Sequence, residues 1–149
     1  MTESVLLAVL LLGVVIWVGG MAFALLVLRP SLHVLQPPQR LALHAEVFAH
    51  FFHLVWHAMP LVLLSGYGLV FTVFGGFAEA GGAVHGMHAI GLLMALVFAW
   101  IYFVPWKAMR VATTDGDAAA AGAAVGRIRH LIWVNLGLGV LTVVMASFT

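Results

Sequence analysis

Long apolar runs separated by short polar connections dominate this chain. Four runs reach the length of about 20 residues that a helix needs to cross a bilayer, at residues 5–28, 45–74, 85–106 and 130–148. Strands would need turn signals at much shorter intervals. The pattern predicts an all-α integral membrane protein, an antiparallel up-down four-helix bundle that forms a single domain over residues 1–149.

The connections carry residues that begin and end helices. Pro37-Pro38 suits the first turn of the second helix, because proline is preset for that position. Gly75-Gly76 and Gly81-Gly82 predict a turn region in the second connection. Asp115-Gly116-Asp117 breaks the third connection, and Asp117 is the expected N-cap of an alanine-rich extension into the fourth helix. The first run lacks a basic n-region and is too long for a cleavable signal peptide, so we expect it to remain as a helix.

Positive charge is confined to two of the connections. The N-terminus, the second connection and the C-terminus contain no lysine or arginine. The six basic residues occupy the first and third connections, as Arg29, Arg40, Lys107, Arg110, Arg127 and Arg129. The positive-inside rule therefore predicts a multi-pass protein of the bacterial inner membrane with both termini on the outer, periplasmic side.

Composition narrows the possible functions. The chain is 64% hydrophobic and 7% charged, which makes the lipid bilayer its main partner. Its net charge of +1 gives no reason to expect a nucleic-acid partner. It has no cysteine, so disulfides, iron–sulfur clusters and a thiolate haem ligand are excluded. A bound metal would have to be held by histidine, methionine, glutamate or backbone oxygen.

Three histidines in the second run form the main candidate site. At about 100° per residue, Glu46, His50, His53 and His57 lie within a wedge of roughly 60° on one helix. Ionisable groups inside a membrane are costly and normally face the interior of a bundle. The stripe therefore predicts inward-facing ligands for a metal or a haem.

A haem is the first interpretation of these ligands. A b-type haem fits between helices when two histidines on different helices face each other. We expect His50 or His53 to pair with His130 in an inner site, and His57 or His88 to serve an outer one. The predicted protein is a membrane cytochrome with one or two haems b, an oxidoreductase that acts on a quinone, a porphyrinogen or a small oxidant. A redox partner and a second copy of the chain are its further candidate partners.

Copper is the alternative. Imidazole suits copper and thioethers suit Cu(I), so His85-Gly86-Met87-His88 is a candidate copper site at the outer mouth. The protein would then serve copper transport or resistance. Some polar groups have a simpler explanation, since membrane histidines and asparagines often only bond helices together. We expect that role for Asn135, and a structural role for His33 and His44.

Two segments resemble a known family. Trp17-Val18-Gly19-Gly20, followed by Leu28-Arg29-Pro30, looks like the first helix of the CopD-like (copper-resistance D) membrane family. Residues 127–139, which include Asn135-Leu136-Gly137-Leu138-Gly139, resemble that family's last helix. The resemblance covers essentially the whole chain as a stand-alone four-helix version, and it implies copper import or tolerance.

A more distant resemblance is to the HemJ-type protoporphyrinogen oxidases, which are haem-b membrane proteins. Trp17, Arg29-Pro30, His88 and Arg129 match that group's pattern. Two places depart from it. Ile90 stands where the group has a lysine, and Leu136 stands where it has a glutamate. These departures put protoporphyrinogen oxidation in doubt. The stripe of His50, His53 and His57 goes beyond either family pattern, and it favours a haem protein.

Overall fold

The computed structural model describes residues 1–149 and consists of four long helical segments without strands. All four are long and apolar enough to cross a membrane, which confirms the predicted all-α fold. The first segment comprises α1 (Thr2–Phe23), η1 (Ala24–Leu28), α2 (Arg29–Ser31) and η2 (Leu32–Val34). The second is α3 (Pro37–Val73); the third comprises α4 (Gly82–Ile101), η3 (Tyr102–Trp106) and α5 (Lys107–Thr114); the fourth is α6 (Ala118–Ala146).

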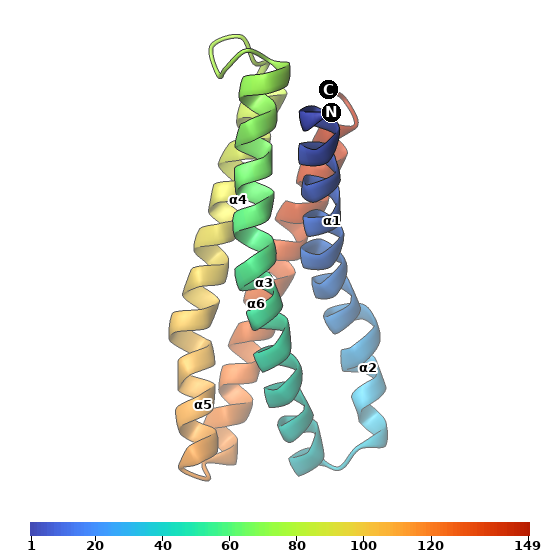
Figure 1. Ribbon diagram of the computed structural model, residues 1–149. Coiled ribbons are helices and arrows are strands. Elements are labelled where there is room, and N and C mark those ends of the chain that lie inside the picture. The colour runs from blue at the N-terminus through green and yellow to red at the C-terminus, as the bar shows by residue number, and fades with distance from the viewer.

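Successive segments run in opposite directions, so both termini lie at one end of the bundle together with the connection between α3 and α4 (Figure 1). The connection before α3 and the connection between α5 and α6 lie at the other end. That end carries the basic residues, and we refer to it as the basic end. Which side of the membrane it faces remains a prediction.

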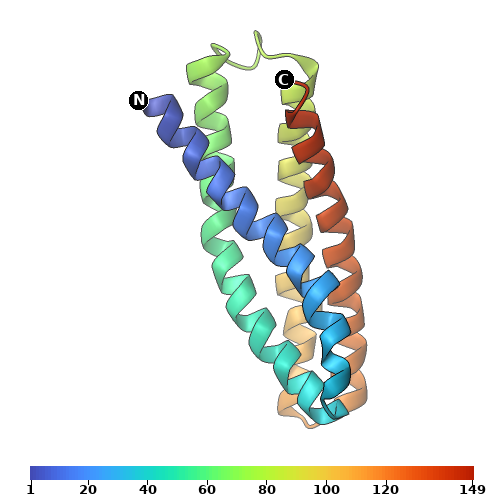
Figure 2. The ribbon, with the colours of Figure 1, turned by 90° about the vertical axis from the view of Figure 1, so that its right-hand side faces the viewer.

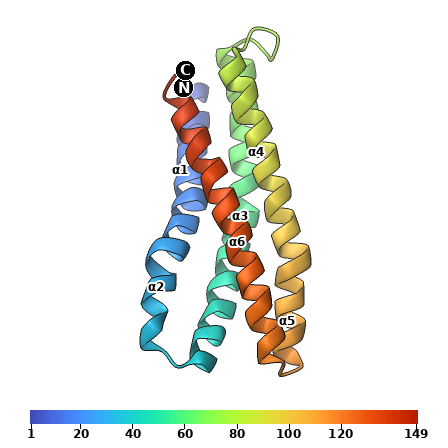
Figure 3. The ribbon, with the colours of Figure 1, turned by 180° about the vertical axis from the view of Figure 1, so that it is seen from behind.

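Two helix pairs build the bundle. α1 packs mainly against α3, and α4 packs mainly against α6. Figure 2 shows α1 running obliquely, from beside α3 at the N-terminus toward α6 at the basic end. Figure 3 shows the same bundle from behind, with α6 alongside the α4–α5 segment.

Small residues allow the helices to approach closely, as is typical of membrane bundles. A Cβ atom added at Gly20 of α1 would collide with the ring of Phe51 on α3. One added at Gly139 of α6 would lie 2.8 Å from Cγ2 of Val18 on α1. Glycine at these two positions therefore sets the distance between α1 and its neighbours.

The core is apolar and rich in aromatic rings. Phe52 of α3 is almost fully buried, and its ring packs edge-on against Phe98 of α4 at 5.8 Å and Trp106 of η3 at 5.3 Å. Asn135 of α6 is a buried polar exception; its Nδ2 donates a hydrogen bond to the Met94 carbonyl, 3.2 Å away. This interhelical bond confirms the expected role of Asn135.

The predicted helix ends are present. α3 begins at Pro37, and the backbone N–H of Gln36 donates to Oε1 of Gln39 at 3.0 Å. Gly116 has a φ of +71° in the turn before α6, where L side chains are disfavoured. The N–H of Ala120 donates to Oδ1 of Asp117 at 3.0 Å, which confirms Asp117 as the N-cap.

Two segments contain a wide, π-type turn near a proline. η3 includes Pro105, and η1 is followed directly by Arg29-Pro30. Proline has no N–H to donate to the carbonyl four residues earlier, and a wide turn is one way in which a helix accommodates it. Both wide turns lie in the half of the bundle nearer the basic end (Figure 1).

Candidate functional site: outward histidines and a basic recess

The histidine stripe of α3 lies on the outside of the bundle. His50, His53 and His57 are all exposed, and 83% of the His50 side chain and 76% of Glu46 are accessible. The expectation that this stripe faces the interior is therefore wrong. The opposite face of α3 is larger and apolar, and it fills the core with Phe48, Phe52, Val55 and Met59.

Two of these histidines, His50 and His57, have one ring nitrogen hydrogen-bonded to a backbone carbonyl and the other free, as is common in histidines that bind metals. Nδ1 of His50 lies 2.8 Å from the carbonyl of Glu46, and Nδ1 of His57 lies 2.9 Å from the carbonyl of His53. A carbonyl can only accept, so each Nδ1 donates and the neutral ring keeps a free lone pair on Nε2. The rings of His53 and His57 are 4.8 Å apart, so their two imidazoles can approach one ion.

A second pair of histidines lies near the start of α4. Nδ1 of His85 bonds to the carbonyl of Gly81 at 3.1 Å, and Nδ1 of His88 bonds to that of Val84 at 3.0 Å. Both rings pack against Phe77, at 5.8 and 5.2 Å. His88 is half-buried between α3 and α4, since its Nε2 lies 3.7 Å from the position that a Cβ on Gly66 would take. Again Nε2 is free in both residues.

Met87 is not on the face that these two histidines share. His85 and His88 lie about 60° apart around α4, whereas Met87 lies about 160° from His85. Met87 is half-buried against the small cluster of Val70, Ala80 and Val84. In the structure Met87 is therefore a packing residue.

His130 lies in a different place from the histidines with which it was expected to pair. It is exposed in a surface recess with Trp100, Val104 and Arg127, whereas the recess beside His50 is formed by α3 residues alone. The structure does not bring His130 to His50 or His53. It also has no group of three histidine, aspartate or glutamate side chains that could hold a metal ion.

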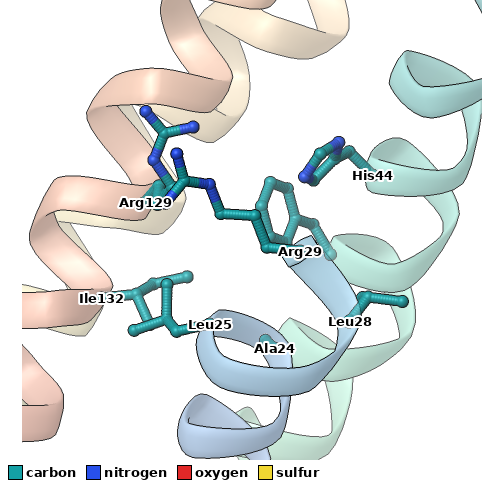
Figure 4. Close-up of a pocket in the computed structure, with 8 residues that line it drawn as sticks. Ala24, Leu25, Leu28, Arg29, His44, Arg129 and Ile132 are labelled. Atoms are coloured by element: carbon teal, nitrogen blue, oxygen red, sulfur yellow. The ribbon is translucent and has the colours of Figure 1, made fainter. Parts of the chain in front are cut away.

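A basic recess, which the sequence interpretation did not identify, lies near the basic end. Arg29 of α2, His44 of α3 and Arg129 of α6 line it, together with apolar side chains that include Leu25, Phe48 and Ile132 (Figure 4). The sequence does contain a signal for it. Each of the three basic residues directly borders an apolar run, so the three were bound to lie at a similar depth in an up-down bundle.

Comparison with known proteins identifies the family. The family model described as copper resistance protein D matches residues 45–149. This range contains α6 with the motif of residues 127–139 and all the candidate histidines, and it begins after the first helix. No curated protein and no solved structure matches the chain. Since the family match covers well over half of its length, the protein belongs to the copper resistance protein D family of membrane proteins.

Proposed function

We propose that this protein binds copper as Cu(I) and serves copper transport or tolerance at the membrane. The family supports copper over the haem interpretation. The chain offers imidazoles and thioethers and no thiolate, and the first two suit Cu(I). The observation that carries the proposal is the His53–His57 pair, with rings 4.8 Å apart and a free Nε2 on His57.

The donor sets fit a transported ion better than a stored one. A closed structural metal site surrounds its ion with about four ligands, and the structure contains no cluster of even three histidine or acidic side chains. Pairs of imidazoles suit Cu(I), which is stable with few ligands. We therefore interpret each histidine pair as a site that binds Cu(I) transiently, and we call such a site a station.

Two such stations lie at different depths. His57 is nine residues before Gly66, the residue of α3 that faces Nε2 of His88. At 1.5 Å per residue this separates the two pairs by roughly 14 Å along the helix axis. One ion cannot bridge that distance, so an ion would occupy the α4 pair and the α3 pair in turn.

The test is Cu(I) stoichiometry of the purified full chain, measured anaerobically against a competing chelator. We expect His53→Ala/His57→Ala and His85→Ala/His88→Ala each to remove about one equivalent of Cu(I). His33→Ala is the control, because His33 lies in η2, away from both pairs, and should leave binding unchanged. Copper tolerance of cells producing each variant should follow the same order.

Two results would overturn the proposal. One is unchanged stoichiometry in both double variants. The other is a colored protein with a Soret band at one haem per chain and no Cu(I) retained against the chelator, which would favour the cytochrome interpretation instead.

A further inference from the structure

Two guanidinium groups converge in the basic recess without an acidic partner. Arg29 and Arg129 come from different helices, yet Figure 4 shows their guanidinium groups next to each other, with the His44 ring across the recess. Arg129 is half-buried between the helices, whereas Arg29 is exposed. Two like charges this close repel, and partial burial weakens the screening by water.

Nothing in the chain compensates these charges. The single ion pair within 4.0 Å joins Glu46 to His50, on the outer face of α3. Arg40 donates a side-chain hydrogen bond to the carbonyl of Leu35. The side chains of Arg29 and Arg129 form no hydrogen bond within the chain. Their N–H donors therefore remain available. Guanidinium forks match the oxygens of a phosphate, which they bind in a bidentate manner.

The depth of the recess indicates where such an anion would come from. Arg29 follows the first apolar run, His44 precedes the second and Arg129 precedes the fourth. The ends of apolar runs lie where hydrocarbon gives way to lipid headgroups. Next to Arg29, Leu26 and Val27 are exposed on the outer surface of the helix, where an acyl chain can lie.

We propose that this recess binds the phosphate group of an anionic phospholipid, held between Arg29 and Arg129, with the lipid's acyl chains on the apolar surface beside them. Basic pockets between membrane helices commonly take such headgroups. The bound lipid would neutralise the repulsion and join α2 to α6 at the basic end. This inference does not depend on copper binding.

The experiment is native mass spectrometry of the full chain in mild detergent, titrated with phosphatidylglycerol, phosphatidylcholine or inorganic phosphate. We compare Arg29→Gln/Arg129→Gln with the matched control Lys107→Gln/Arg127→Gln. The control removes the same charge at the same end but outside the recess. The wild type should prefer phosphatidylglycerol to phosphatidylcholine, and the recess variant should bind phosphatidylglycerol roughly 30-fold more weakly. The control should bind like the wild type.

Arg29→Lys/Arg129→Lys separates folding from binding, because it keeps both charges and lacks the planar fork. It should bind phosphatidylglycerol with an intermediate affinity. Equal losses in the recess variant and the control, or no loss in the recess variant, would overturn the proposal. So would binding of inorganic phosphate at the recess without any preference for phosphatidylglycerol, since that assigns the site to a free anion.

Discussion

The side-chain nitrogen of Asn135 on α6 donates a hydrogen bond to the backbone carbonyl of Met94 on α4, at 3.2 Å. This side-chain hydrogen bond links two of the long helices, whereas the other side-chain hydrogen bonds are local. It lies deep in the apolar core. The oxygen of the same amide, Oδ1, is buried without a partner. One half of the side chain thus stabilises the bundle while the other half carries a desolvation cost.

Asn135→Ala should destabilise the bundle by about 0.3–0.6 kcal/mol. Interhelical hydrogen bonds in membranes average about 0.6 kcal/mol, and removing the unpartnered Oδ1 offsets part of the loss. The measurement is reversible unfolding in mixed detergent. Thr142→Ala is the control, since Thr142 bonds only within its own helix, to the carbonyl of Leu138. A larger effect at Thr142 than at Asn135 would contradict the structure.

Gly20 and Gly19 offer a test of the contact between α1 and α3. A Cβ at Gly20 would collide with Phe51, whereas one at Gly19 meets nothing within 4 Å. Gly20→Val should therefore destabilise the protein by about 1–3 kcal/mol through overpacking. Gly19→Val should change its stability by less than about 0.5 kcal/mol. Thermal unfolding of the two variants in the same detergent compares them directly, and equal melting temperatures would refute this packing.

The sequence predicted the fold well because four apolar runs and their connections carry strong, local signals. Pro37 and Asp117 begin helices as expected. It predicted the orientation of α3 badly, although the necessary information was present. Phe48, Phe52, Val55 and Met59 recur with helical spacing on the face opposite the histidines. In a bilayer the lipid is as apolar as the core, so the close packing of these bulky side chains, and not their apolar character, favours this face as the one that contacts other helices.

The basic recess was harder to predict, because its geometry depends on tertiary structure. The residues at the ends of the apolar runs indicate a shared depth for Arg29, His44 and Arg129. They do not indicate which helices are neighbours or how each side chain turns. The oblique path of α1 brings Arg29 toward α6, and no local pattern encodes that path.

Asp117→Ala should destabilise the start of α6 by about 1 kcal/mol, because the N–H of Ala120 would lose its acceptor. Hydrogen exchange should increase at the first turns of α6 and remain unchanged in α4. Asp115→Ala is the matched control, since Asp115 lies in the same exposed connection and caps nothing through its side chain. Equal exchange in both variants would contradict the cap.

Membrane orientation is testable with reporter fusions. The basic connections predict that the C-terminus and the α3–α4 connection face away from the cytoplasm. A periplasm-active phosphatase fused at either position should be active, and one fused after Asp115 should be inactive. The reverse pattern of activities would show that the bundle is inserted the other way round.

The wide turn η1 changes the direction in which the side chains after it point. A π-type turn amounts to one inserted residue, so every side chain beyond it is rotated by about 100° relative to an uninterrupted α-helix. Trp17 and Met21 before the turn, and Arg29 after it, therefore follow two different angular registers. Deleting one residue of η1 would keep every charge in the chain yet rotate the Arg29 guanidinium out of the recess. The length of this turn therefore determines where that side chain points as much as its sequence does.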